Sequence, residues 1–166
     1  MSASSFDDNT PGPPGEGSAR RAATAAVTAG AARVLADLGF PPLAEVGLSS
    51  GRRADLMGVG PTGTIALVEV KSGPDDLRAD GKWTDYLGFA DLFYFAIPPD
   101  FSPDLLIRLT GLPDRAGIIV ADAYDGAVVR EATAQALPGA RRKALLIQLA
   151  RLASWRRLHA AADPQR

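Results

Sequence analysis

Apolar residues recur along the chain with two different spacings, and the change between them separates helices from strands. Residues 19–38 are rich in alanine, carry Val27, Val34 and Leu35 on a helical repeat, and precede Gly39. Alanine favours helices, and glycine commonly ends them. The first periodic segment therefore predicts a helix over residues 19–38.

Residues 1–18 show no such periodicity. They are rich in Ser, Pro, Gly and Asp, and Phe6 is their one aromatic residue. A segment of this composition buries too little apolar surface to offset the entropy of ordering its backbone. We therefore expect a disordered N-terminal tail over residues 1–18 and a single domain over residues 19–162.

Three strand-like segments follow the first helix, over residues 43–48, 52–59 and 64–72. The links between them, residues 49–51 and 61–63, each have three residues and end in glycine. Such links are typical of hairpins that close with a left-handed residue. The segments therefore predict a three-stranded antiparallel meander.

The remainder of the chain alternates between helical and strand patterns. The expected elements are a polar helix over 74–88 that Gly81 interrupts, a strand over 92–97, a short helix over 103–110, a hairpin of 117–121 with 127–131, and a long helix over 140–161. This order predicts an α/β fold in which a mixed sheet, begun by the meander, is flanked by helices.

The two three-residue loops set a register for the meander. The first loop opposes Glu45 to Asp55, and the second opposes Asp55 to Glu69. Directly opposed residues share a face of the sheet, and Lys71 points the same way as Glu69 because it lies two residues further on. The opposite face is then wholly apolar, and we expect it to be the core side. It carries Ala44, Val46, Leu48, Ala54, Leu56, Ala66, Val68 and Val70, whereas Arg53, Met57, Ile65 and Leu67 surround the charged cluster.

Glu45, Asp55 and Glu69 would repel one another on adjacent strands unless a cation lies between them. Oxygen ligands without His or Cys favour Mg²⁺ or Mn²⁺ over zinc. Lys71 is suited to orient or deprotonate a water, or to stabilise charge on a phosphate. The alternative is structural, because Glu-x-Lys on a strand is commonly a solvated ion pair on an exposed face.

Asp55 followed by Glu69-Val70-Lys71 resembles the PD-(D/E)xK nuclease motif, with Ala54 where proline is common. Further blocks in the same order resemble the bacterial MmcB-type DNA repair proteins, and the likeness covers about residues 22–160. The blocks are GRRADL (51–56), VEVKSG (68–73), DDLRADGKWTDY (75–86), LFYFAIPPDF (92–101) and ARRKALL (140–146).

The resemblance implies a restriction-endonuclease-like core and a metal-dependent DNA endonuclease that acts in repair. By residue, it implies Asp55 and Glu69 as metal ligands, Lys71 as the catalytic lysine and Glu45 as an accessory acid. Superfamily members often supply that acid from the first helix, which here offers Asp37. DNA and other repair proteins are the implied partners. The alternatives are an inactive module that binds DNA or a repair partner, and a nuclease directed at RNA.

Four residues outside this motif are candidate DNA contacts. Lys82 and Tyr86 are spaced i and i+4, and so would share a helix face, with Lys82 on a phosphate and Tyr86 hydrogen-bonding or stacking. Arg52 and Arg53 suit phosphate contacts, or are simply exposed strand arginines. The neighbouring aromatic residues, Trp83 and Phe89, are interpreted as core residues.

Gly58, Gly60 and Gly63 spell the dinucleotide-binding pattern GxGxxG. That fingerprint requires a helix after the glycines, whose first amides bind the pyrophosphate. Here a strand-like segment follows instead. We therefore interpret the glycines as turn residues.

Composition narrows the chemistry further. The 166 residues include 18 Lys+Arg, 19 Asp+Glu, no Cys and one His, with a net charge of -1. These counts exclude disulfides and thiolate zinc sites and disfavour a Ser/His/Asp triad. The chain has no apolar stretch long enough to span a membrane and no signal-peptide pattern, so we expect a soluble cytoplasmic protein.

Positive charge gathers at the C-terminal end, where residues 139–166 hold seven Lys+Arg against Asp163. The helix there also has an apolar stripe, and its basic side suits DNA phosphates or a solvated surface. His159 is expected at the surface. The apolar stripe comprises Leu145, Leu146, Leu149, Leu152 and Ala153.

Overall fold

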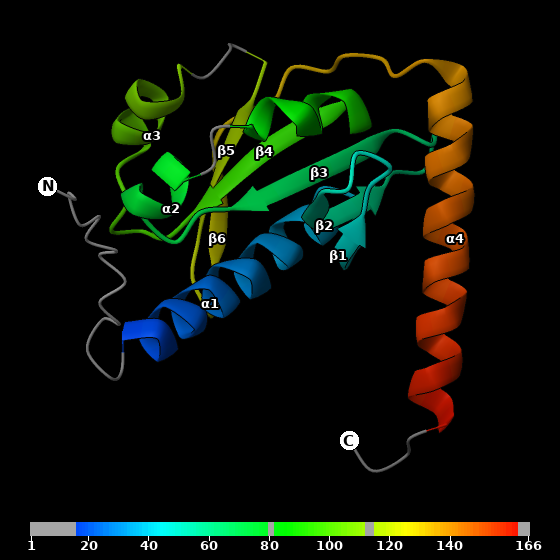
Figure 1. Ribbon diagram of the computed structural model, residues 1–166, viewed down its shortest axis with the longest axis horizontal. Coiled ribbons are helices and arrows are strands. Elements are labelled where there is room, and N and C mark those ends of the chain that lie inside the picture. The colour runs from blue at the N-terminus through cyan, green and yellow to red at the C-terminus, as the bar shows by residue number, and fades with distance from the viewer. Residues whose placement is uncertain (1–15, 80–81, 112–114, 163–166) are drawn as a thin grey trace, which may run out of the picture.

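Six strands form one open sheet, and their order across the sheet follows their order along the chain (Figure 1). The computed structural model describes residues 16–79, 82–111 and 115–162. The strands are β1 (Pro42–Gly47), β2 (Arg53–Val59), β3 (Ile65–Val70), β4 (Leu92–Ile97), β5 (Gly117–Ala121) and β6 (Gly126–Arg130). Pairing is antiparallel from β1 to β3, parallel from β3 to β5 and antiparallel between β5 and β6. The predicted mixed sheet that begins with an antiparallel meander is thus confirmed.

Helices cover both faces of this sheet. The helices are α1 (Glu16–Asp37), α2 (Pro74–Ala79), the 3₁₀ helix η1 (Trp83–Phe89), α3 (Pro103–Thr110) and α4 (Gly139–Ala162). Helix α1 crosses one face and contacts all six strands, whereas side chains of the other helices pack on the opposite face. Helix α4 runs along the β1 side of the sheet, and its C-terminal end extends past the other elements (Figure 1). Within the described residues, no helix has the length and apolar character that crossing a membrane requires.

The start of α1 corrects the predicted boundary of the N-terminal tail. The helix begins at Glu16, so residues 16–18 belong to it. Residues 1–15 of the predicted disordered tail lie outside the described residues.

The predicted register of the meander is confirmed. Leu56 of β2 pairs with Ala44 of β1 and with Val68 of β3, as the two loops predict. Asp55, the preceding residue, is therefore level with Glu45 across the first hairpin. A period of two leaves little freedom here, because a shift by one residue would move every side chain to the other face.

The glycines of the two loops explain how these hairpins close. Gly51 and Gly63 have φ angles of +84° and +82°, which glycine adopts without strain. At Gly58 and Gly60 an added Cβ would lie within 3 Å of Phe40. The interpretation as turn residues is confirmed for Gly60 and Gly63, which a hydrogen bond joins across the β2–β3 turn, whereas Gly58 lies within β2 and packs closely against Phe40.

Both faces of the sheet are buried, which corrects the prediction of a single core side. Met57, Ile65 and Leu67 were expected to surround the charged cluster, yet each is at most 1% exposed. They share a core with Trp83 and Phe89 of η1, on the face opposite α1. Parallel strands require crossover segments that lie on the sheet faces, and these segments cover the central strands on both sides.

The apolar face predicted for the meander is divided between the two cores. Ala44 packs against the core under α1, whereas Val46, Leu48 and Ala54 belong to the opposite core. Glu45 has a left-handed backbone with a φ of 51°. Ala44 and Val46, on the two sides of Glu45, therefore point to opposite faces of the sheet, whereas in an extended strand they would share one face. The prediction assumed unbroken alternation and is wrong at this position.

A buried aspartate attaches α4 to the sheet. The Asp91 carboxylate accepts hydrogen bonds from the backbone N–H groups of Ile65 and Leu137, and Arg142 of α4 donates two more at 2.6 and 2.7 Å. Burial favours the neutral acid, but the hydrogen bonds from Arg142 and the two backbone groups outweigh it and lower the pKa of Asp91. One side chain thus joins β3, the segment before α4, and α4 itself.

Replacing Asp91 by Ala is expected to lower the free energy of unfolding by about 3 kcal/mol near neutral pH, because it leaves buried donors unsatisfied. A carboxyl group with a lowered folded-state pKa stabilises the fold above its unfolded pKa and loses that contribution as pH falls through the folded value. Urea unfolding at pH 7 and at pH 3 should therefore show a smaller acid effect in Asp91→Ala than in the parent.

Asp75→Ala is the matched control for this prediction, since the Asp75–Arg78 ion pair is exposed on both sides. Its loss should change stability by less than about 1 kcal/mol. Equal destabilisation by the two variants would contradict the anchoring role of Asp91.

Candidate active site

The pairing of β2 with β3 ends just before Asp55 and Glu69. The last paired residues are Leu56 with Val68, at the end of a ladder that starts at Val59 with Ile65. One residue further, the Asp55 side chain takes the place of a strand partner, because its Oδ2 accepts a hydrogen bond of 2.7 Å from the Val70 N–H. The two strands thus diverge around the Asp55 carboxylate.

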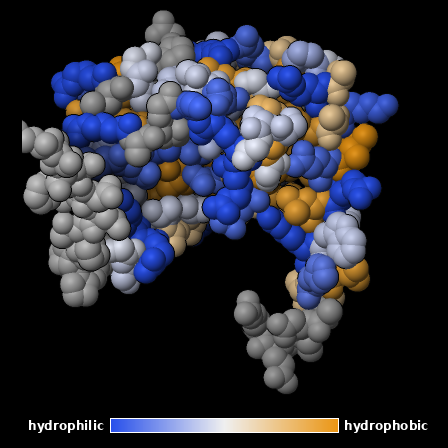
Figure 2. Space-filling model, in the orientation of Figure 1, coloured by the Kyte–Doolittle hydropathy of each residue, from blue (hydrophilic) through white to orange (hydrophobic). Residues whose placement is uncertain are grey.

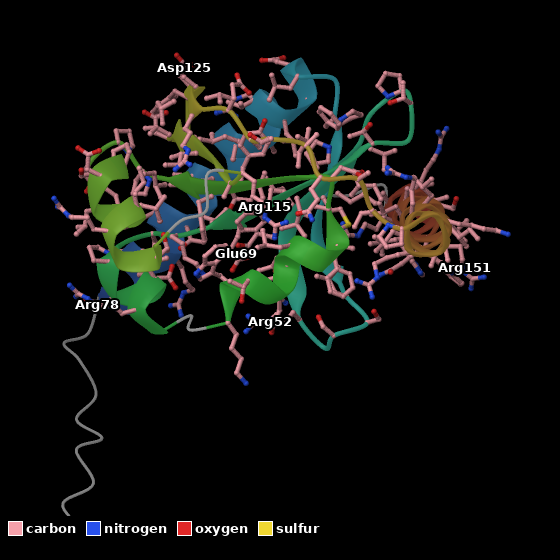
Figure 3. All side chains as sticks on the ribbon, turned by 90° about the horizontal axis from the view of Figure 1, so that it is seen from above. Arg52, Glu69, Arg78, Arg115, Asp125 and Arg151 are labelled. Atoms are coloured by element: carbon pink, nitrogen blue, oxygen red, sulfur yellow. The ribbon has the colours of Figure 1, made fainter. Side chains whose placement is uncertain are left out.

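A buried ion pair lies at the end of β3. Lys71 Nζ is 3.0 Å from Glu69 Oε1, and the two residues are only 4% and 6% exposed. The Lys71 N–H also donates to Ala96 O of β4, which fixes the backbone just past the strand end. The predicted proximity of Glu69 and Lys71 is therefore found, but in the interior; Figure 3 shows Glu69 well inside the outline of the molecule. The alternative of a solvated ion pair on an exposed face is wrong.

A pocket of about 790 Å³ brings these side chains together. Asp55, Glu69 and Lys71 all line it, and residues of α1, β1 and α2 complete its walls. Two strand ends and three further elements therefore enclose the predicted motif. Two further pockets among the described residues are smaller, with volumes of about 450 and 10 Å³.

The surroundings of Asp55 favour the neutral form of its carboxyl group. Burial raises the pKa of the Asp55 carboxyl above its ordinary value, against the lowering effects of the Val70 N–H, Lys71 and Arg53. The Asp76 carboxylate raises it further. A cation beside Asp55 would favour the charged form and reverse this effect.

Glu45 differs from the other predicted acids. It lines the same pocket, but its side chain is exposed and lies 3.4 Å from Arg53 in an ion pair. Within the described ranges, no three Asp, Glu or His side chains converge closely enough to hold a metal ion. The structure therefore groups Asp55, Glu69 and Lys71 and leaves Glu45 on the solvent side. Asp37, the acid offered by the first helix, is exposed at the end of α1 and does not line the pocket.

Asp76 of α2 also belongs to the pocket, although it was not among the sequence-predicted site residues. Its Oδ2 accepts hydrogen bonds from the Ser72 N–H at 3.0 Å and the Ser72 Oγ at 3.2 Å. The bonds close the turn that directly follows Lys71. The available signal was an acid in the first turn of the helix after Pro74, a position where a side chain readily meets backbone N–H groups.

The predicted common face of Lys82 and Tyr86 is wrong. Residues Trp83–Phe89 form a 3₁₀ helix, in which positions three apart share a face. Tyr86 is buried and its hydroxyl donates to Arg53 O, whereas Lys82 is exposed. The same spacing of three buries Trp83 and Phe89, as predicted for core residues.

Arg52 contacts residues of η1, whereas Arg53 lies at the pocket. Arg52 forms an ion pair with Asp85 at 3.0 Å and lies over the Tyr86 ring, 5.3 Å from its centre. Arg53 is exposed and lines the pocket beside Glu45. Of the four predicted DNA contacts, only Arg53 therefore borders the pocket.

Helix α4 forms hydrogen bonds with the backbone of β1. An Arg156 guanidinium nitrogen donates to Glu45 O at 3.3 Å, and the Gln148 amide donates to Gly47 O. Leu145 and Leu149 of the predicted apolar stripe are buried. Leu146 and Leu152 of that stripe are partly buried, and Ala153 is exposed.

The outer side of α4 carries apolar residues at the surface (Figure 2). Ile147, Trp155 and Leu158 are each more than half exposed. The Trp155 ring stacks on His159, with centroids 5.4 Å apart, so His159 lies at the surface as predicted. Figure 3 shows Arg151 pointing away from the body on this helix.

A family model and a solved structure match this chain. The family model described as DNA repair protein MmcB-like matches residues 12–165. A solved structure, the SPO1766 protein of unknown function from Silicibacter pomeroyi, has a TM-score of 0.74 and 40% sequence identity, covering 86% of this chain and 92% of that chain. No curated protein matches the sequence.

The Glu69–Lys71 ion pair yields a stability test. Lys71→Met removes one charge and leaves the buried Glu69 carboxylate, so it should lower the free energy of unfolding by about 3–5 kcal/mol. The double variant Glu69→Gln/Lys71→Met removes both charges at similar volume and should lie within about 1 kcal/mol of the parent. Urea unfolding followed by tryptophan fluorescence measures both.

If the double variant were as unstable as Lys71→Met, the ion pair itself would be required for the fold. The burial of the pair would then be explained by the stability of the fold and would no longer support a functional role.

Proposed function

Since the chain belongs to the family of MmcB-like DNA repair proteins, we propose that it is a metal-dependent DNA endonuclease that hydrolyses phosphodiester bonds during repair. One observation carries this proposal: Asp55, Glu69 and Lys71, from two diverging strands, line one pocket. The three side chains combine acidic oxygen donors with a cation. Such groups can hold a divalent metal ion, orient a water and stabilise negative charge on a phosphate.

Asp55 and Glu69 are the proposed ligands of Mg²⁺ or Mn²⁺. Both offer carboxylate oxygens, which these hard cations prefer. Burial raises the pKa of Asp55, and a cation bound beside it would favour its charged form, which supports the proposal. Glu45 on the exposed side of the pocket is proposed as an accessory acid. When bound, the ion would neutralise charge on the phosphate oxygens.

Lys71 is the proposed catalytic lysine. Its ammonium group is buried and held 3.0 Å from Glu69, so its position is fixed before substrate arrives. From the pocket wall it would position the attacking water and stabilise negative charge that develops on the phosphate. Asp76 supports this role by closing the turn that follows Lys71.

DNA is the proposed partner. Arg20, Arg21 and Arg53 border the pocket and would face the phosphates beside the cleaved bond. Helix α4 adds further positive charge without any Asp or Glu along its length. Its cations are Arg141, Arg142, Lys143, Arg151, Arg156 and Arg157.

A nuclease-fold module that binds DNA without cutting it is the second candidate. The observation that favours it is that Asp55 already accepts a hydrogen bond from Val70 N–H, while Glu69 is paired with Lys71. Salt-sensitive DNA binding with no cleavage in Mg²⁺ or Mn²⁺ would identify this case.

Asp55→Ala and Lys71→Ala should each reduce Mn²⁺-dependent cleavage of DNA by about 10²-fold or more, because each removes a group that acts on the reacting phosphate. Gel assays on single-stranded, duplex, gapped and damaged DNA measure this. Asp75→Ala, an exposed acid on α2, is the control and should cleave at the parental rate. Parental activity in both site variants would refute the assignment.

Arg151→Glu should weaken DNA binding and lower the slope of log K against log salt by about one, if α4 contacts phosphates. Arg108→Glu on α3 makes the same charge change at another exposed position. Fluorescence anisotropy at several salt concentrations compares the two. Equal effects would show that α4 contributes only to the general charge of the protein.

A further inference from the structure

The pocket extends well beyond the reacting groups. Its volume of about 790 Å³ falls in the range of sites that enclose a ligand of roughly drug size. Glu69 and Lys71 line it but are over nine-tenths buried, so a phosphate must enter the pocket to approach them. A single nucleotide has the dimensions for this, whereas two paired strands do not.

The α1 wall of the pocket is uncharged along most of its length. Beyond Arg20 and Arg21, it consists of short side chains. They are Thr24, Ala25, Thr28, Ala29 and Ala32. The Thr24 and Thr28 hydroxyls donate to the carbonyls of Arg20 and Thr24, within the helix itself. The wall therefore presents mainly apolar surface to a ligand.

The residues of the pocket that lie outside α1 include both apolar and charged side chains. Pro42, Ala44 and Leu56 add apolar surface near the α1 wall, and the charged groups Asp55 and Lys71 lie beside them. A ligand that fits has one flat apolar part and one anionic part. A nucleotide has both, in its base and its phosphate.

We propose that the pocket takes one unpaired nucleotide, with its base against Ala25 and Ala29 of α1 and its phosphate toward Asp55, Glu69 and Lys71. The substrate class is single-stranded DNA, or duplex DNA with an unpaired nucleotide such as a gap or a displaced base. The role of the phosphate end rests on the proposed nuclease function. Arg20 and Arg21 then lie where the strand continues along α1.

Ala29→Leu tests the base wall, and Ala36→Leu is its matched control. Both alanines are exposed on α1, but only Ala29 lines the pocket. Binding is measured without metal, by titrating the full chain into a single-stranded oligonucleotide that contains 2-aminopurine. Ala29→Leu should raise the Kd by about tenfold or more, because the added carbons occupy space that the base needs, and Ala36→Leu should match the parent. Equal affinities in the two variants would overturn the proposal.

Cleavage separates this proposal from the proposed function. With Mn²⁺, the parent should cut single-stranded and gapped DNA at least about tenfold faster than continuous duplex, because pairing must be broken before a base enters the pocket. Equal rates on continuous duplex would overturn the unpaired-nucleotide pocket and leave the nuclease function standing. Binding that depends on Ala29, without cleavage of any substrate, would refute the nuclease function and support the nucleotide pocket.

Discussion

The candidate site depends on the separation of β2 from β3 at Asp55. The Asp55 carboxylate accepts the Val70 N–H, so a side chain satisfies a backbone donor that strand pairing would otherwise use. The separation opens the sheet beside Glu69 and allows a pocket to form in what is otherwise a covered surface.

Charge burial is the main energetic consequence of this arrangement. Glu69 is buried near the end of β3, where every other residue is apolar, and Lys71 is buried directly after the strand. Removing two charges from water is unfavourable, and their mutual attraction commonly no more than offsets it. We therefore expect the pair to add little to the stability of the fold, although both of its residues line the pocket. At the other end of β3, the Asp91–Arg142 pair has a structural explanation, because it satisfies backbone groups and attaches α4.

Much of the fold is predictable from the sequence because its determinants are local. Three-residue loops ending in glycine set the register and alternation identifies the strands, so Asp55 and Glu69 fall on neighbouring strands by sequence pattern alone. The left-handed Glu45 was not predictable, because nothing in its residue type requires a positive φ. The burial of Met57 and Leu67 depends on helices that follow much later in the chain. The 3₁₀ geometry of η1 likewise follows from how its aromatic residues pack on the sheet.

The central claim is that Asp55 and Glu69 bind a divalent cation in this pocket, and calorimetric titration of Mn²⁺ into the full chain tests it most directly. We expect saturable binding by the parent that is lost or weakened about tenfold or more in Asp55→Asn, since a ligand charge is removed while the side-chain shape is kept. Asp75→Asn should bind as the parent does. No saturable binding by the parent, or equal binding by Asp55→Asn, would show that Asp55 and Glu69 do not form a metal site.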